Sequence, residues 1–220
     1  MQLRYIVLAG AMALSFTTVS GSAVAEDDDT TYSNQLFFRG AYSALTDARS
    51  PEVFTDTLAA TNANDDKGGW SIAAGLDLSA MKLEDLGGAN VMGEIFLEYS
   101  KFSDRLVTQT TSFLLGTPKQ SDVGVTELNV TVAPKVRFDS LGSGRFRPFV
   151  IPIGLSFLVN SPPSDDTTYL DVGLHFGAGI DVLVIDRISV GYDVRYTHGF
   201  ESTNTNTNYW STGAYVALNF

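Results

Sequence analysis

The end of the chain constrains the fold more than any other segment. The last twelve residues, Tyr209 to Phe220, alternate large apolar side chains with small or polar ones and stop on an aromatic residue. Such alternation is typical of a β-strand with one apolar and one polar face. Chain ends usually fray unless a sheet or a docked helix holds them. A final strand whose last residue must stay paired therefore indicates a sheet that closes on itself.

The start of the chain predicts export from the cytoplasm. Arg4 supplies a positive charge, residues 5–16 form a short apolar run, and Ala23-Val24-Ala25 is a small-residue cleavage site. The run is too short for a membrane-spanning helix. We therefore predict a cleaved signal peptide at 1–25, an acidic flexible leader at 26–33, and a single domain at 34–220.

Composition excludes several classes of function. Loss of Arg4 with the signal peptide takes the formal charge from −11 to −12, which would repel nucleic acid. The chain has no cysteine, so it carries neither a lipid-modified cysteine nor a disulfide. No phosphate-binding loop or cluster of metal ligands is present. We therefore expect no cofactor and no metal.

After the signal peptide no apolar run is long enough for a helical span, so a membrane-spanning form must be a β-barrel. Eight segments alternate with the period of two that strands require. Each is about as long as a tilted barrel strand that crosses a bilayer. The predicted strands are 34–45, 70–81, 91–102, 123–138, 146–159, 169–184, 188–200 and 209–220.

The gaps between these segments also carry information. The longer gaps tend to follow odd-numbered strands and the shorter ones even-numbered strands, which is typical of long extracellular loops and short periplasmic turns. Ile185-Asp186-Arg187 has room only for a hairpin. In the fifth segment we expect Phe149, Ile151, Ile153 and the apolar residues after them to share one face. The prolines there remove ladder donors, so we also expect a bulge or a local gap in pairing.

Alternation alone does not say which face meets lipid, since a soluble lipocalin-like carrier uses the same pattern with its apolar face inward. The composition of the polar face distinguishes a membrane barrel from such a carrier, because this face combines glycine, alanine and serine with charges of both signs. Small residues and paired charges suit the narrow interior of an eight-stranded barrel. The predicted lumen network, structural or gating, comprises Arg39, Asp77, Glu94, Glu98, Glu127, Lys135, Arg137, Arg147, Asp171, His175, Asp181, Asp193 and Arg195.

Aromatic residues gather near the ends of the predicted strands. Outer-membrane barrels carry such residues as girdles at the two membrane–water interfaces. The predicted interfacial residues are Trp70, Tyr99, Phe138, Tyr169, Tyr196, Trp210 and Phe220.

The mature chain resembles small outer-membrane β-barrels of the OmpA-transmembrane-domain and opacity-protein class. The resemblance rests on the signal peptide, the eight segments, the strand end at 196–200 and the finish at 216–220. It implies an all-β, eight-stranded, antiparallel up-and-down transmembrane barrel in a Gram-negative-type cell outer membrane. It also implies contact with outer-membrane lipid and lipopolysaccharide, and recognition of Phe220 by the assembly machinery. The extracellular partner stays open.

Hairpin connections suggest which lumen charges meet. We expect Arg39 near Asp77, and Glu94 near Lys135. Arg137 and Arg147 are expected to approach each other and to need an acid, either Glu94 or Asp181. A register-fixing polar core is favoured over a gate, because an unpaired buried charge is costly.

Histidine chemistry is the remaining candidate activity. Small barrels include lipid A deacylases that place histidine and serine two residues apart on a late, lipid-facing strand. His198 lies in that neighbourhood, but Phe200 stands where the serine would be. A nucleophile needs its base within hydrogen-bond reach, so we predict an interfacial role for His198 and no catalytic residue.

The sequence thus predicts a non-enzymatic outer-membrane barrel with a structural or surface-interaction role. Three alternatives stay open: a narrow, porin-like channel for small solutes, a lipid A-modifying enzyme that uses His198, and a periplasmic lipocalin-like carrier.

Overall fold

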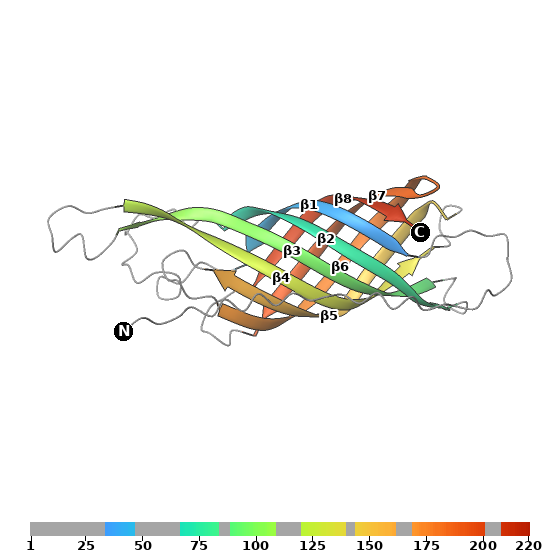
Figure 1. Ribbon diagram of the computed structural model, residues 1–220, viewed down its shortest axis with the longest axis horizontal. Helices are drawn as coiled ribbons and strands as arrows, with labels where there is room; N and C mark the ends of the chain where they lie inside the picture. The colour runs from blue at the N-terminus through green and yellow to red at the C-terminus, as the bar shows by residue number, and fades with distance from the viewer. Residues whose placement is uncertain are drawn as a thin grey trace, which may run out of the picture. The chain divides into compact units, whose positions relative to one another are not determined.

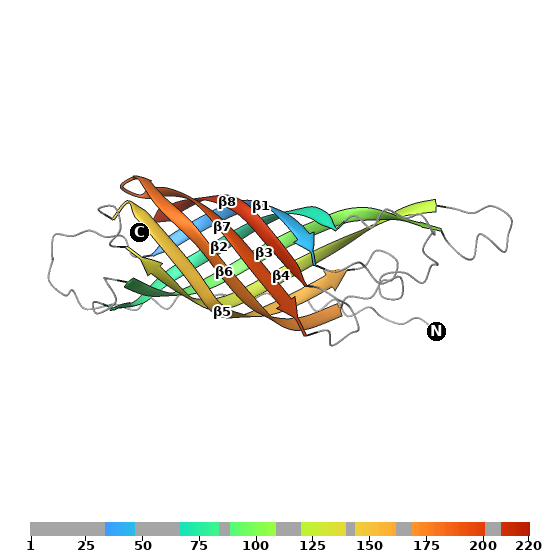
Figure 2. The same cartoon turned by 180° about the vertical axis from the view of Figure 1, so that it is seen from behind.

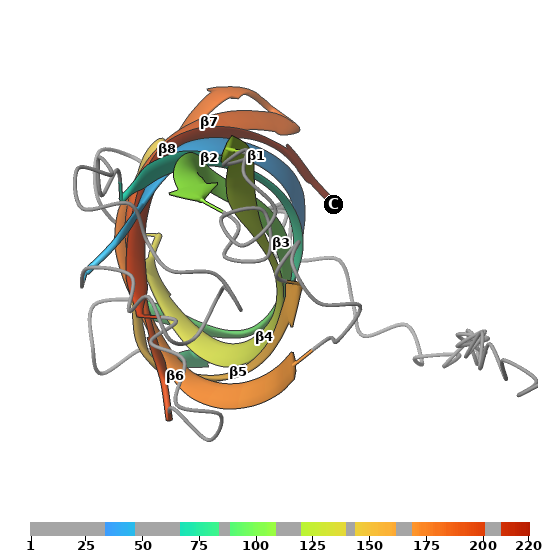
Figure 3. The same ribbon diagram turned by 90° about the vertical axis from the view of Figure 1, so that its left-hand side faces the viewer.

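The computed structural model describes residues 34–46, 67–83, 89–108, 120–139, 144–161, 169–200 and 208–220. These residues form eight antiparallel strands in sequence order, and the last strand pairs with the first to close a barrel. Figure 3 shows the ring from one end. The predicted up-and-down barrel is confirmed. Its strands are β1 (Gln35–Leu45), β2 (Gly68–Leu83), β3 (Ala89–Thr108), β4 (Gln120–Phe138), β5 (Phe146–Ser161), β6 (Tyr169–Ile185), β7 (Ile188–Gly199) and β8 (Tyr209–Asn219).

The predictions for the signal peptide at 1–25 and the leader at 26–33 concern residues outside the described part of the chain. Within that part, no helix is long and apolar enough to cross a membrane.

The strands β3 and β4 are longer than the sequence pattern predicts. β3 has 20 residues and β4 has 19, and their pairing continues beyond a register shift between Phe102 and Arg105. The two strands extend past their neighbours at one end of the barrel (Figures 1 and 2). We call this the distal end. The opposite, proximal end contains the start of β1 and the end of β8.

The two faces of the wall differ sharply in polarity. On the outer face, Phe38 is 63% exposed, and Ile72, Leu170 and Val216 are also more than half exposed. Charged side chains on the inner face, such as Asp77, are buried. The barrel therefore has an apolar exterior and a polar interior, the reverse of a water-soluble protein.

In β5 the sequence prediction assigned some residues to the wrong face. Phe149 and Ile151 are buried inside the barrel, whereas Ile153 is 48% exposed on the outer face. The register between β5 and β6 shifts between Ile151 and Gly154, so two successive residues fall on the outside. The expected bulge at the prolines is confirmed, but the assumption of an unbroken apolar face was wrong because a bulge reverses the alternation.

The strands are joined tightly at the proximal end. Ile185 pairs with Ile188 across the two-residue turn between β6 and β7, as the sequence predicts. The backbone N–H of Asn34 donates to the carbonyl oxygen of Phe220 at 3.1 Å, and the N–H of Phe220 donates to the carbonyl oxygen of Asn34 at 3.0 Å. The last residue of the chain therefore takes part in closing the ring.

Glycines on the inner wall make room for large rings. A β-carbon built on Gly75 would overlap the ring of Phe37, and one built on Gly191 would overlap the ring of Tyr215. Both rings belong to the barrel interior, where Phe37 and Tyr215 pack at a centroid distance of 5.4 Å. Large and small side chains thus alternate around the wall so that the narrow interior can be filled.

Gly75→Ala is expected to lower the free energy of unfolding by about 1–3 kcal/mol, because the added methyl group overpacks the interior against Phe37. Urea unfolding of the barrel in phospholipid vesicles would measure the change. Phe37→Leu removes the overlapping ring atoms, so the double variant should lose less stability than the sum of the two single changes. If the double variant were less stable than the sum of the two single changes, the proposed overlap would be wrong.

Candidate functional site

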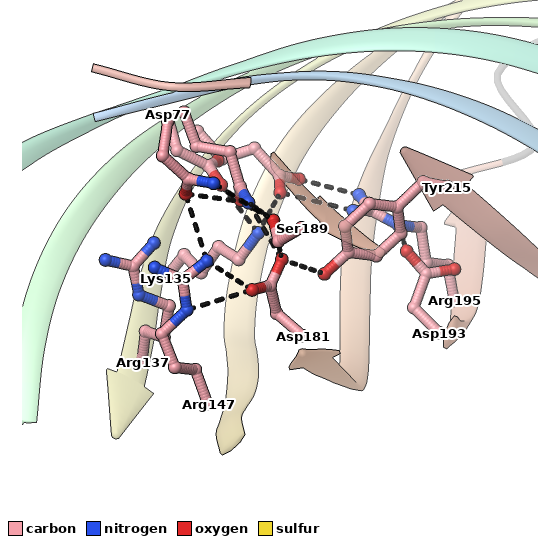
Figure 4. Close-up of polar contacts among 12 residues, drawn as sticks. Asp77, Lys135, Arg137, Arg147, Asp181, Ser189, Asp193, Arg195 and Tyr215 are labelled. Carbon is pink, nitrogen blue, oxygen red and sulfur yellow. Dashed lines mark hydrogen bonds and ion pairs between the residues drawn. The ribbon is translucent and has the colours of Figure 1, made fainter. Parts of the chain in front are cut away.

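The candidate site is the charged interior of the barrel. All thirteen side chains predicted to form the lumen network are at most 5% exposed. They come from β1 to β7, and each lies at an inward position of its strand. Figure 4 shows part of this interior, with ion pairs and hydrogen bonds that connect different strands. The interior is therefore a site of buried charge, whose function stays a prediction.

Glu94 on β3 is the centre of the network. Its carboxylate accepts hydrogen bonds from Arg195 at 2.6 and 3.2 Å and from Lys135 at 3.2 Å. Lys135 also donates to Asp77 at 2.7 Å. In a ring of eight strands, β3 and β7 are on opposite walls. The Glu94–Arg195 pair therefore connects opposite walls across the lumen.

The network continues toward the distal end. Arg195 donates to Asp193 at 2.9 Å, and Arg39 donates to Asp193 at 2.7 Å. Arg39 also donates to Glu98 at 2.8 Å. The resulting chain alternates four carboxylates with three cations, in the order Asp77, Lys135, Glu94, Arg195, Asp193, Arg39 and Glu98.

Aromatic rings pack against the two cations that flank Glu94. The ammonium of Lys135 lies 4.0 Å from the ring centroid of Phe149, and the guanidinium of Arg195 lies 4.0 Å from that of Phe96. Cations over ring faces gain electrostatic stabilisation when they are removed from water. Phe37 packs in the same buried cluster. The rings thus fill the space around the ion pairs and exclude water from it.

A second group of contacts surrounds Asp181 near the proximal end. Its carboxylate accepts hydrogen bonds from Gln35 at 2.8 Å, Ser189 at 2.9 Å and Tyr215 at 3.1 Å. Arg147 forms an ion pair with the same carboxylate. These donors come from β1, β7, β8 and β5, so a single carboxylate on β6 joins five strands.

Near the distal end the tyrosine hydroxyl of Tyr209 connects opposite walls. It donates to Glu98 at 2.9 Å and accepts from the amide of Asn129 at 2.9 Å. Asn129 lies on β4 and Tyr209 on β8, four strands apart in the ring. The interior is therefore bridged at more than one level by direct contacts.

The expected pairings are partly right. Glu94 pairs with Lys135, and Asp181 is the acid that holds Arg147, as predicted. Arg39 does not pair with Asp77 but with Glu98 and Asp193. Arg39 is opposite Ala73 in the β1–β2 register, and its long side chain reaches across the lumen instead of along the wall.

Arg137 is the other exception. Its guanidinium binds Asp139, two residues along the chain, at 2.6 Å. Neither of the two acids expected for Arg137 is its ion-pair partner among the described residues. The aspartate at the end of β4 is closer in sequence, and short local pairs of this kind require no ordering of distant strands.

Uncharged polar residues of the network escaped the sequence analysis. Gln35, Ser71, Asn129, Ser189 and Tyr209 all hydrogen-bond to its charged or polar members. Each occupies an inward position of the same period-two pattern. That pattern could have identified them, although it could not have named their partners.

His198 lies on the outer face among aromatic rings. Its ring centroid lies 6.5 Å from that of Tyr196 and 6.1 Å from that of Phe200. The neighbouring Thr197 is buried on the opposite face, where its hydroxyl contacts His175 at 3.0 Å. In the part of the chain that the structure describes, no hydroxyl contacts His198 as a nucleophile would.

The predicted interfacial aromatics are mostly on the outer face. Trp70, Tyr99, Tyr196, Trp210 and Phe220 are between 37% and 50% exposed. Phe138 is half-buried, and the side chain of Tyr169 is outside the described part. Trp70 and Tyr99 pack at 6.0 Å between ring centroids, and Trp210 packs on Tyr42 at 5.7 Å. Tyr42 is a member of this group that the sequence analysis missed.

No group of three or more acidic or histidine residues within the described ranges is arranged to bind a metal ion.

No protein-family model matches the chain, and no curated protein matches its sequence. Solved structures of small outer-membrane barrels do share its fold. Neisserial surface protein A aligns with a TM-score of 0.50 at 13% identity, over 86% of this chain and 97% of that one.

Two other structures align less closely. The N-terminal barrel domain of Pseudomonas aeruginosa OprF gives a TM-score of 0.43 at 13% identity, over 86% of this chain and 98% of that chain. Ail of Yersinia pestis aligns with a TM-score of 0.40 at 12% identity, over 84% of this chain and 97% of that chain. The closed ring of eight strands and the alignment with Neisserial surface protein A show that the chain has the fold of small eight-stranded outer-membrane barrels.

Proposed function

We propose that this chain is an integral protein of the bacterial outer membrane with a non-enzymatic, structural or surface-interaction role. The observation that carries the proposal is the inverted distribution of polarity: apolar side chains cover the outside and ion pairs fill the inside. Soluble monomers rarely expose contiguous apolar patches larger than a few hundred Å². A bilayer is the environment that suits such a wall.

The aromatic residues support the same placement. Tyr42, Trp70 and Trp210 lie on the adjacent strands β1, β2 and β8, and Tyr42 is directly opposite Trp70 in the register. Amphipathic rings of this kind favour the headgroup level of a membrane. They would set the outer boundary of the apolar belt, in contact with lipid and lipopolysaccharide. Phe220 would serve the assembly machinery.

The interior argues against the alternative functions. A lipocalin-like carrier needs an apolar cavity, whereas the inner wall here carries ion pairs. A channel needs a continuous path, whereas Glu94 and Arg195 join opposite walls at 2.6 Å. An enzyme using His198 needs a nucleophile beside it, and among the described residues its ring neighbours are Tyr196, which stacks on it, and Phe200, which meets it edge-on. The polar network then serves to fix strand register and to close the lumen.

The test is made on outer membranes from cells that express the full chain. Detergent-extracted protein should run differently on a gel before and after boiling, because a closed barrel resists unfolding by detergent at room temperature. Its mass should correspond to residues 26–220. The same protein in a planar bilayer should give no single-channel current, because the lumen is bridged by side chains.

Two results would contradict the proposal. Recovery in the soluble periplasmic fraction without a mobility shift would favour a carrier. Steady single-channel currents that disappear on changing lumen residues would favour a channel.

A further inference from the structure

Three polar residues form a row on the inner wall of the distal half. Ser100 of β3 is directly opposite Glu127 of β4, and Glu127 is directly opposite Asn160 of β5. All three are at most 2% exposed. Directly opposed residues on one face of a sheet have β-carbons about 5 Å apart. The three side chains therefore project into the same part of the lumen.

Polar atoms of all three side chains lack a hydrogen-bond partner. They are the hydroxyl of Ser100, one carboxylate oxygen of Glu127, and both the oxygen and the nitrogen of the Asn160 amide. Leaving one buried polar group unsatisfied costs about 1–3 kcal/mol, and native proteins contain few such groups. Three adjacent residues with this property form a group of donors and acceptors that ordered water or a bound ligand would satisfy.

The charges around the three residues bear on the charge of such a ligand. The buried charged side chains of the described residues comprise seven acidic and five basic ones. Glu127 takes part in none of the ion pairs formed by these basic residues. Glu98 and Asp171 are close enough to act on Glu127 electrostatically as further negative charges. These negative charges favour a cation over an anion at this position.

We propose that Glu127, Asn160 and Ser100 bind a divalent cation of the calcium type. A carboxylate, an amide carbonyl and a hydroxyl are the hard oxygen donors that calcium prefers. Because two of the three donors are neutral, the dissociation constant should be in the range of extracellular calcium modules, about 10⁻⁴–10⁻³ M. The proposal concerns the barrel interior, and its test does not depend on the location of the protein in the cell.

The experiment uses the full mature chain, folded in a non-ionic detergent free of lipopolysaccharide. Terbium, a luminescent substitute for calcium, should give emission sensitised by nearby aromatic rings such as Tyr209. Added calcium should displace terbium and extinguish that emission. Calcium should also raise the temperature at which the folded gel band is lost, relative to protein in a chelator.

Two variants remove different donors. Glu127→Gln keeps the shape and removes the charge, and it should abolish the terbium emission that calcium displaces. Asn160→Leu replaces an amide that has no hydrogen-bond partner with an apolar side chain of similar size. It should weaken calcium binding at least about tenfold while the chelator-treated protein stays as stable as the wild type, since the lost polar atoms made no bond.

Asp186→Asn is the matched control. Asp186 is an exposed carboxylate in the turn between β6 and β7, at the proximal end of the barrel, and its removal should leave the emission unchanged. The proposal is overturned if wild-type protein gives no calcium-displaceable emission. It is equally overturned if Glu127→Gln and Asn160→Leu both retain the emission, because terbium would then bind elsewhere.

Discussion

Glu94→Gln should lower the free energy of unfolding by about 3–5 kcal/mol, the cost of removing one partner from a buried ion pair. The carboxylate of Glu94 holds Lys135 and Arg195 at the same time. The amide that replaces it has no charge to offset either cation, and both stay inside the barrel. Urea unfolding in phospholipid vesicles, followed by tryptophan fluorescence, would give the change.

The specificity of this effect can be tested with two further variants. Asp186→Asn makes the same chemical change at an exposed position and should alter stability by less than about 0.5 kcal/mol. Glu94→Gln combined with Arg195→Gln should cost less than the sum of the two single changes, because the pair is removed together. Simple additivity would show that the 2.6 Å contact contributes no coupling energy.

Ile95→Arg is expected to destabilise the barrel by about 2–4 kcal/mol in a bilayer, the cost of an arginine near the midplane on the lipid-facing side. Ile95 is 48% exposed on the outer face of β3. Along β3, it lies between Val91 and the aromatic Tyr99. Leu76 and Val132 are directly opposite it on the two neighbouring strands. The measurement is again urea unfolding in vesicles.

Leu128→Arg is the depth control for this prediction. Leu128 is also on the outer face, but it is directly opposite Tyr99, at the level of the aromatic residues. An arginine near the interface costs only about 0–1 kcal/mol. Two equally small costs would mean that both positions face water, which would contradict the membrane placement. The difference between the variants therefore reports the position of the lipid.

Local periodicity predicted the eight strands, and the resemblance to small outer-membrane barrels implied their up-and-down arrangement. An inward or outward position depends only on the parity of a residue within its strand, so Arg39, Glu94 and Asp181 could be assigned from the sequence. Closure of the ring followed from the paired, aromatic end of the chain. The parity argument fails at a bulge, and for that reason Phe149 and Ile151 were assigned to the wrong face while Ile153 was assigned correctly.

The partners inside the lumen could not be predicted in the same way. Neighbouring strands suggest which side chains are adjacent along the wall, and this reasoning found Lys135 for Glu94. Arg195 is on the opposite wall, and its contact with Glu94 depends on the diameter and stagger of the whole ring. Long side chains such as that of Arg39 span several strands. The choice among acids is therefore made by three-dimensional packing rather than by spacing along the chain.

The backbone bonds between Asn34 and Phe220 have a consequence for how the fold depends on the order of the chain. They bring the beginning and the end of the barrel together, and every strand has a hydrogen-bonded neighbour on both sides. The junction between β8 and β1 is thus equivalent to any other hairpin, except that no peptide link crosses it. If a short linker joined β8 to β1 and the chain were opened between two other strands, the permuted chain would form the same ring. The architecture is cyclic, and the order in which its strands are synthesised is one of several that are compatible with it.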